Sequence, residues 1–211
     1  GLYEFEEMAF VLHFLRLHDS FVDLGANIGS FSILAASVGA DVLAIEPVPQ
    51  TFAALTQNIS HNTSSSGTIE ALNVGLSDKD GELLFTTDLG AMNHIVTATD
   101  ASATRAGVVA LPVRRLDEIV DGRRPSLLKI DAEGHELEIL LGSPDVLQMP
   151  ELAVLIIEMN DNPVMGSSDL RNKVGVLRVG DRVRVIVIRE GQQQEIVMRV
   201  GSRNEPETAT A

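Results

Sequence analysis

Residues 21–29, with the sequence FVDLGANIG, combine an apolar run, an acidic residue and two glycines. Asp23 ends the predicted strand, and Gly25 and Gly29 let the backbone turn tightly and approach a ligand without interference from a Cβ atom. An apolar helical pattern follows, so the stretch predicts a strand–loop–helix cradle for a nucleotide-like ligand. The G-x-x-x-G spacing departs from the G-x-G-x-x-G dinucleotide fingerprint, and a tight turn in another α/β protein would give the same pattern.

A second acidic residue, Glu46, ends the next short apolar run, and Pro47 stops the strand there. A carboxylate about 20 residues beyond the first strand can accept two hydrogen bonds from ribose hydroxyls. The alternative is an ordinary exposed carboxylate at a strand end. The position of Glu46 relative to Gly25 and Gly29 favours the ribose role.

A third polar group follows the apolar run 127–130 and consists of Asp131, Glu133, His135 and Glu136. A carboxylate or imidazole at a strand end can act as a general base. The oxygen-rich spacing would also permit Mg²⁺ or Ca²⁺. Because these groups cannot all face one ion from a strand–helix junction, we predict no metal.

Three further positions leave two interpretations open. Lys129, inside the strand, either neutralises the acidic rim or packs its aliphatic stem. Asn93 and His94 lie in the polar stretch 88–107, which we expect to form a loop over the sheet edge. They either contact a substrate or have no specific role.

These residues need elements to position them, and a coarse reading gives alternating strands and helices. The pattern predicts helices at 6–17, 28–38, 50–60, 116–120 and 136–141, and strands at 21–24, 42–45, 69–76, 83–86, 108–113, 127–131 and 154–158. Such alternation implies parallel βαβ units and an α/β fold with a doubly wound, mostly parallel sheet. Ligands bind beyond the carboxyl ends of strands in these sheets. One rim therefore collects Asp23, Glu46, Ser77, Asp131 and Glu158.

Composition narrows the class of protein. A chain of 211 residues usually makes one domain, and a net charge of −14 with three lysines argues against nucleic acid or an anionic membrane as partner. There is no cysteine, and the longest apolar run, 152–157, is too short to span a bilayer. No basic-then-apolar leader opens the chain, so we expect a soluble cytoplasmic protein.

Residues 3–159 resemble the FkbM-type methyltransferases that depend on S-adenosylmethionine (SAM). The run from Leu128 to Glu136, LKIDAEGHE, is the most specific match, because the pattern K-I-D-x-E-G-x-E is rare outside this group. The other matching stretches are 3–4, 21–29, 45–47, 76–78 and 116–117.

The resemblance implies a Rossmann-like class I methyltransferase fold, SAM as cofactor and O-methylation of a hydroxyl, often on a sugar or polyketide-type product. It assigns the methionine end of the cofactor to Asp23, Gly25, Asn27 and Gly29. It assigns the ribose to Glu46, and the adenine to the region of Leu76 and Ser77.

Methyl transfer from SAM mainly needs alignment of oxygen, methyl and sulfur. An aliphatic hydroxyl is a poor nucleophile, so a nearby base should accelerate the reaction by about 10²–10⁴-fold. Asp131 is the first candidate for base or substrate orienter and His135 the second, although His135 could equally be a solvent-facing residue at a helix start. Glu133, Asn93 and His94 are the candidate substrate contacts, and Glu133 could instead favour the helix N-terminus.

The carboxyl-terminal part departs from this pattern, because residues 159–203 resemble the last half of a PDZ domain from an HtrA-type serine protease. Residues 1–158 carry a net charge of −15 and residues 159–211 a net charge of +1, which suggests a chimaeric chain. We expect a helix at 169–177 and strands at 182–189 and 195–200, joined by a turn containing the glutamines. These elements should complete the sheet of one domain, 1–203, followed by a disordered tail, 204–211.

Three hypotheses follow. The first is an O-methyltransferase acting on a hydroxyl of a small molecule or sugar. The second is a SAM-binding protein that lost transfer activity when its carboxyl end was replaced. The third is a peptide-binding module built on the PDZ-like segment or, less favoured, a nucleotide-dependent oxidoreductase.

Overall fold

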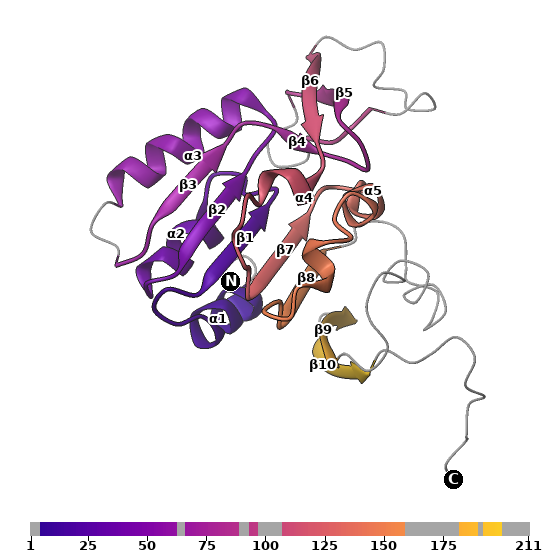
Figure 1. Cartoon of the computed structure of the whole chain (residues 1–211). Helices are drawn as coiled ribbons and strands as arrows, with labels where there is room; N and C mark the ends of the chain where they lie inside the picture. Colours follow the sequence, from indigo (N-terminus) through magenta and orange to yellow (C-terminus); the bar gives the residue numbers. More distant parts are fainter. Residues whose placement is uncertain are drawn as a thin grey trace, which may run out of the picture.

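The computed structural model describes residues 5–62, 66–88, 93–96, 107–158, 182–189 and 192–199. Its elements follow one another along the chain from indigo to yellow in Figure 1. They are α1 (Phe5–Phe14), β1 (Ser20–Leu24), α2 (Ser30–Ser37), β2 (Asp41–Ile45), α3 (Pro49–His61), β3 (Ile69–Leu72), β4 (Gly75–Leu76), β5 (Gly81–Thr86), β6 (Val108–Arg114), α4 (Leu116–Ile119), β7 (Leu127–Asp131), α5 (Glu136–Leu141), the 3₁₀ turn η3 (Val146–Gln148), β8 (Val154–Glu158), β9 (Arg182–Arg189) and β10 (Gln192–Arg199).

The main sheet has seven strands in the order β10-β9-β8-β7-β1-β2-β3. Every neighbouring pair is parallel except β9 with β10, which is antiparallel. The order reverses at β1, where the chain winds first towards β3 and then back through β7. The predicted doubly wound, mostly parallel α/β sheet is therefore confirmed.

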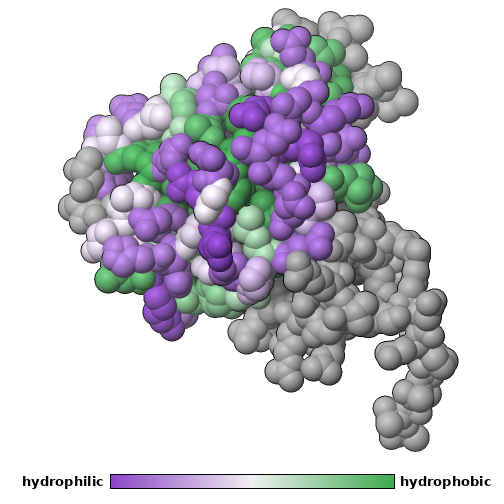
Figure 2. All heavy atoms as spheres, viewed as in Figure 1, coloured by the Kyte–Doolittle hydropathy of each residue, from purple (hydrophilic) through white to green (hydrophobic). Residues whose placement is uncertain are grey.

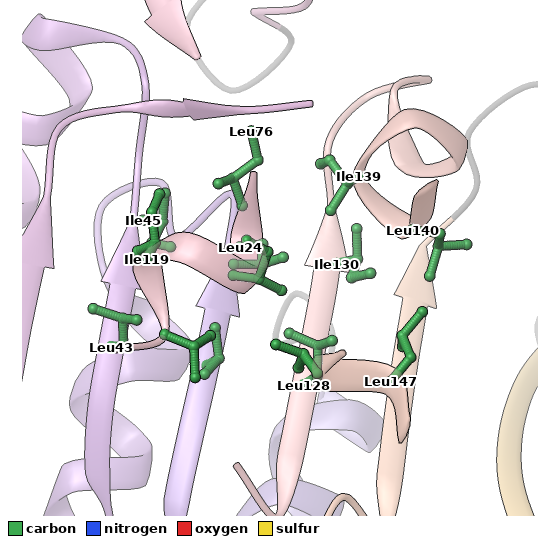
Figure 3. Packing of buried hydrophobic residues seen from close by; sticks show 14 of the residues in the cluster. Leu24, Leu43, Ile45, Leu76, Ile119, Leu128, Ile130, Ile139, Leu140 and Leu147 are labelled. Carbon is green, nitrogen blue, oxygen red and sulfur yellow. The ribbon is translucent and has the colours of Figure 1, made fainter. Parts of the chain in front are cut away.

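Both faces of this sheet are buried, which explains why its central strands are almost continuously apolar. Alternate residues of each strand face opposite layers. Val22 and Leu24 pack with the layer that contains α4, α5 and η3 (Figure 3). Phe21 packs on the other face with residues of α1, α2 and α3. Asp23 and Lys129, which alternate with the first set, belong to this second face.

Two helices begin or end two or more residues away from the predicted position. α2 begins at Ser30, two residues later than expected, because Asn27 and Gly29 have φ angles of 51° and 92° and belong to the preceding loop. α1 ends at Phe14, because the Arg16 backbone N–H donates to the Asp19 carboxylate and His18 adopts a φ of 68°.

The predicted single strand 69–76 is wrong, because it divides into β3 and β4, which belong to different sheets. The side chain of Asn73 donates hydrogen bonds to the carbonyl oxygens of Glu46 and Pro47, each at 2.9 Å, and so turns the chain away from β2. A separate three-stranded sheet follows, in the order β4-β6-β5. In it β5 pairs with β6, so the predicted strand 83–86 is not paired with the strand that precedes it in the chain.

The carboxyl-terminal strands extend the main sheet. β9 pairs in parallel with β8, through Val154 with Arg184 and Leu155 with Val185, and β10 pairs with β9 along its length. β10 begins at Gln192, so the glutamines that we expected in the turn lie in the strand. The predicted helix 169–177 and the tail 204–211 lie outside the described residues.

The described surface on the side seen in Figure 2 is mostly hydrophilic, and apolar side chains show mainly in the gaps between polar ones. This agrees with a chain in which 22% of residues are charged. No helix among the described residues combines the length and apolar character needed to cross a membrane.

Candidate functional site

A cleft lies at the carboxyl ends of β1, β2 and β7, at the edge where ligands bind in sheets of this kind. The small sheet and residues 93–95 form its other side. The described lining contains three carboxylates and no lysine or arginine. It is formed by Leu24, Gly25, Asn27, Ile45, Glu46, Pro47, Val48, Thr51, Val74, Gly75, Leu76, Phe85, Asn93, His94, Ile95, Asp131, Ala132, Glu133, His135 and Ile139.

The loop between β1 and α2 forms one wall through an unusual backbone. Gly25, Asn27 and Gly29 all have positive φ angles, of 74°, 51° and 92°. The N–H groups of Gly25 and Ala26 both donate to the carbonyl of Ile45 at 3.0 Å, which ties the loop to β2. A Cβ atom on Gly25 would overlap the carbonyl oxygen of Asp131, and one on Gly29 would lie 2.6 Å from Leu55 Cδ1. Both glycines are therefore required by close packing as well as by φ.

Glu46 lies at the end of β2 with its side chain turned towards this loop. Its Oε2 accepts a hydrogen bond from the Asn27 N–H at 3.1 Å, and its Oε1 accepts one from the Val48 N–H at 2.9 Å. The residue is 6% exposed, so the predicted strand-end carboxylate is not an ordinary exposed one. The two backbone donors hold the carboxylate plane in one orientation at the cleft wall.

Burial raises the pKa of Glu46 to about 7. The hydrogen bonds from Val48 and Asn27 lower it, while the nearby carboxylates of Asp23 and Asp131 raise it further. Glu46 is therefore partly protonated near neutral pH, so a ligand that donates hydrogen bonds to this carboxylate competes with a proton.

Asp131, at the end of β7, lines the opposite side of the loop. Its Oδ2 accepts a hydrogen bond from Lys129 Nζ at 3.0 Å, and its side chain is 20% exposed. Of the two interpretations of Lys129, charge neutralisation is therefore the one the geometry favours. Asp131 also lines the cleft.

His135 caps the start of α5 and also lines the cleft. Its Nε2 lies 3.1 Å from the hydroxyl oxygen of Ser77, and its Nδ1 lies 3.5 Å from a carboxylate oxygen of Glu138. Burial lowers the pKa of His135, against the opposing effect of Glu138, Glu136 and Asp78. The imidazole is therefore mainly neutral at pH 7, the form in which it can accept a proton.

The turn between Asp131 and His135 has its own support. Glu136 Oε1 accepts hydrogen bonds from the N–H groups of Ala132 and Gly134, at 3.1 and 3.0 Å, and Glu133 adopts a φ of 48°. Glu136 thus stabilises the turn. The turn in its folded form places Asp131, Glu133 and His135 at the same cleft.

Asn93 and His94 line the cleft because hydrogen bonds to β5 hold their segment beside it. The His94 N–H donates to the Thr86 hydroxyl at 2.9 Å, and the His94 carbonyl accepts from the Thr86 N–H at 3.0 Å. Ile95 forms an isolated bridge with Phe85. The expected loop over the sheet edge is, at 93–96, attached to the small sheet.

Eight of the eleven predicted site residues line this cleft: Gly25, Asn27, Glu46, Asn93, His94, Asp131, Glu133 and His135. The other three, Asp23, Gly29 and Ser77, lie behind its lining. Asp23 is 1% exposed and accepts a hydrogen bond from the Ser32 hydroxyl at 2.6 Å. Ser77 is buried beside His135.

Apart from Leu76, the sequence did not reveal the apolar part of the cleft. In Figure 3, Leu76 of β4 and Ile139 of α5 lie above Leu24 and Ile45, the last residues of β1 and β2. Val74, directly before β4, and Phe85 of β5 complete this wall. Their positions depend on the crossing of two sheets, for which no local pattern gives a signal.

This geometry can be compared with known proteins. The family described as "Methyltransferase FkbM domain" matches residues 23–183. The chain belongs to the FkbM methyltransferase family. Membership implies SAM as the methyl donor.

The relatives of this FkbM domain include the "Hexuronic acid methyltransferase AglP" of Haloferax volcanii, which is 34% identical over 146 residues. That alignment covers 67% of the chain and 56% of the relative. "Methyltransferase sdnD" of Sordaria araneosa is 32% identical over 153 residues, which cover 57% of the chain and 59% of the relative. The chain thus spans little more than half the length of these two relatives.

Solved structures agree on the fold. A protein of the NADB-Rossmann superfamily from Streptococcus agalactiae superposes with a TM-score of 0.54 at 15% identity, covering 98% of the chain and 72% of that structure. Precorrin 8w decarboxylase from Methanobacterium thermoautotrophicum gives 0.50 at 12% identity, covering 94% and 88%. These similarities concern the Rossmann-like fold alone.

The comparisons do not support the resemblance of residues 159–203 to a PDZ domain. The FkbM family match continues to residue 183, through the end of β8 and as far as the start of β9. The change in charge at residue 159 therefore does not mark the end of the family similarity.

Proposed function

We propose that this FkbM-family chain is a SAM-dependent O-methyltransferase that acts on a hydroxyl of a sugar or another small molecule. One observation carries the proposal. The Gly25 loop, the buried Glu46 and the end of β7 with Asp131 meet in a single cleft at the carboxyl edge of the sheet.

The residues present fit SAM. Gly25 and Asn27 line the cleft in a loop of positive φ, which would let backbone approach the methionine end closely. Glu46, held by two backbone N–H groups, would accept hydrogen bonds from the ribose hydroxyls. The apolar wall of Leu76, Phe85 and Ile139 would pack on the adenine.

The charge of the cleft also fits. Glu46, Asp131 and Glu133 line it without a lysine or arginine among the described lining residues. A carboxylate-rich lining attracts a sulfonium cation and repels anions such as the pyrophosphate of a dinucleotide. This favours SAM over the nicotinamide cofactor of an oxidoreductase.

When bound, SAM supplies an activated methyl group and its own leaving group. The chain's residues then need to bind the acceptor hydroxyl, orient it and take up its proton. Asp131 would accept a hydrogen bond from that hydroxyl, since it lines the cleft and Lys129 binds only its Oδ2. His135 is the second candidate base, and Glu133, Asn93 and His94 would contact the acceptor.

A sugar or similar acceptor is supported by the name of the Haloferax relative, which acts on a hexuronic acid. We further infer that residues 1–203 form one domain, because β9 continues the sheet through β8. This domain would be cytoplasmic and would have neither nucleic acid nor membrane as partner.

Calorimetry with SAM and S-adenosylhomocysteine, followed by methyl-transfer assays on a panel of sugars and small alcohols, tests the proposal. We expect micromolar binding of both nucleosides and transfer from SAM to at least one hydroxyl. Binding without transfer to any acceptor would favour a SAM-binding protein. Tight binding of NADH, without binding of either sulfur nucleoside, would contradict the proposal.

A further inference from the structure

Lys129 is a charged side chain in the interior of the central strand β7. Its side chain is 3% exposed, and its Nζ lies 3.0 Å from Asp131 Oδ2. A buried ammonium is costly unless its surroundings compensate the charge. The groups around it therefore indicate what Lys129 does.

Two other contacts fix the position of the ammonium. Nζ lies 4.8 Å from the centroid of the Phe31 ring, a cation–π contact that comes from α2. In the β1–β7 ladder Lys129 is the direct partner of Asp23, so both side chains leave the sheet on the same face. Lys129 thus lies between the Asp131 carboxylate at the cleft and the Asp23 carboxylate behind the cofactor loop.

Asp23 needs a compensating charge as well. One of its oxygens is bound by Ser32, and among the described residues Oδ1 has no hydrogen-bond partner. Burial raises the pKa of Asp23, and the Lys129 charge opposes that rise. One cation therefore serves two carboxylates, of which only Asp131 reaches the cleft.

We propose that Lys129 is a positioning residue for the active site: it holds the Asp131 carboxylate in place at the cleft floor by binding Oδ2, which leaves Oδ1 for the ligand. The inference rests on the proposed function, because it gives the Asp131 carboxylate a role at the transfer site. A purely structural alternative is that Lys129 serves only to balance Asp23 in the core.

A pair of double-mutant cycles distinguishes positioning of Asp131 from balance of the Asp23 charge. In the first, Lys129→Met is introduced into an Asp23→Asn background, where no buried Asp23 charge remains to be balanced. In the second, the same change is made in an Asp131→Asn background. Lys129→Arg, which retains a cation and hydrogen-bond donors, is the conservative control.

The readouts are the single-turnover rate of methyl transfer to a responsive acceptor, the unfolding midpoint, and crystal structures of Asp23→Asn with and without Lys129→Met. The transfer rate is used because the acceptor hydroxyl is the group that Asp131 is proposed to bind. We expect Lys129→Met to lower this rate about tenfold in the Asp23→Asn background and less than about twofold in the Asp131→Asn background. Lys129→Arg should restore most of the loss.

The crystal structures give a readout that does not depend on the cofactor. Loss of Lys129 in the Asp23→Asn background should displace the Asp131 carboxylate, while the unfolding midpoint stays close to that of Asp23→Asn alone. An unmoved Asp131 carboxylate with an unchanged transfer rate would overturn the inference and leave Lys129 as a partner of Asp23 only. Failure of the parent protein to bind either nucleoside would instead count against the proposed function.

Discussion

The α-carbon of Gly25 lies directly against the carbonyl oxygen of Asp131, so closely that a methyl group on Gly25 would overlap that oxygen. This contact joins the carboxyl ends of β1 and β7, which are neighbours in the sheet. It fixes the distance between the loop proposed to carry the cofactor and the carboxylate proposed to act on the acceptor. The proposed cofactor-binding loop and the proposed catalytic carboxylate are therefore joined by one backbone contact.

Gly25→Ala tests this contact. We expect a loss of about 3 kcal/mol in the free energy of unfolding, because the positive φ costs about 1–2 kcal/mol and the overlap adds a similar amount. Gly122→Ala is the matched control, since Gly122 has a φ of 78° but nothing within 4 Å of the added methyl group. Chemical unfolding of both variants separates strain from overlap. Equal losses of unfolding free energy would show that the backbone at Asp131 moves to make room for the added methyl group.

The pKa of Glu46, about 7, predicts that cofactor affinity depends on pH. Only the ionised carboxylate can accept two ribose hydroxyls, so binding displaces the proton. Affinity for S-adenosylhomocysteine should fall about tenfold from pH 8 to pH 6. Calorimetry at several pH values measures this.

Glu46→Gln should weaken binding by about tenfold at pH 8 and remove most of the pH dependence, because the amide does not titrate. The exposed Glu82→Gln is the control and should bind like the parent. The sign for folding is opposite: since burial raises this pKa, the Glu46 contribution to stability of the free protein grows as pH falls from about 7 towards the unfolded value of 4.5. An affinity independent of pH would place the ribose elsewhere.

The two candidate bases predict different losses of activity. Asp131→Asn should lower kcat by about 10²-fold or more with a responsive acceptor, since the carboxylate would accept the hydroxyl proton. His135→Gln should cost less, because its Nε2 already lies against Ser77. Single-turnover methyl transfer measures both. A larger loss for His135→Gln would reverse the assignment.

His135 also predicts a pH dependence of stability. Its pKa is lowered by burial, so the folded protein binds the proton less well than the unfolded chain. The free energy of unfolding should therefore decrease as pH falls below about 6.5, the ordinary value for histidine. In His135→Gln this part of the decrease should be absent. Denaturant unfolding between pH 7.5 and 5.5 measures the difference.

The last prediction concerns the contribution of the carboxyl-terminal hairpin, β9 and β10, to stability. Val185 pairs with Leu155 of β8 on one side and with Ile196 of β10 on the other. A proline there cannot take part in a central ladder, so Val185→Pro should lower the unfolding midpoint by several degrees, while Val185→Thr should not. Identical midpoints for the two variants would mean that β9 contributes little to the domain.

The order of strands and helices up to β8 could be predicted because it depends on local sequence patterns. Apolar runs such as 152–157 favour a strand buried on both faces, and Gly25 and Gly29 indicate a turn in the backbone. The strand 69–76 could not be divided in the same way. Its break depends on hydrogen bonds from Asn73 to residues 46 and 47, far away in the sequence.

What the sequence by itself determined is the set of strand ends, and hence that Glu46 and Asp131 face the same edge, because parallel strands place their carboxyl ends together. Only the tertiary structure decided that Asp23 lies behind the loop, that Lys129 binds Asp131, and that the small sheet supplies part of the apolar wall. These features depend on contacts between distant segments. Such contacts are set by packing and burial, so the local sequence around a residue does not predict them.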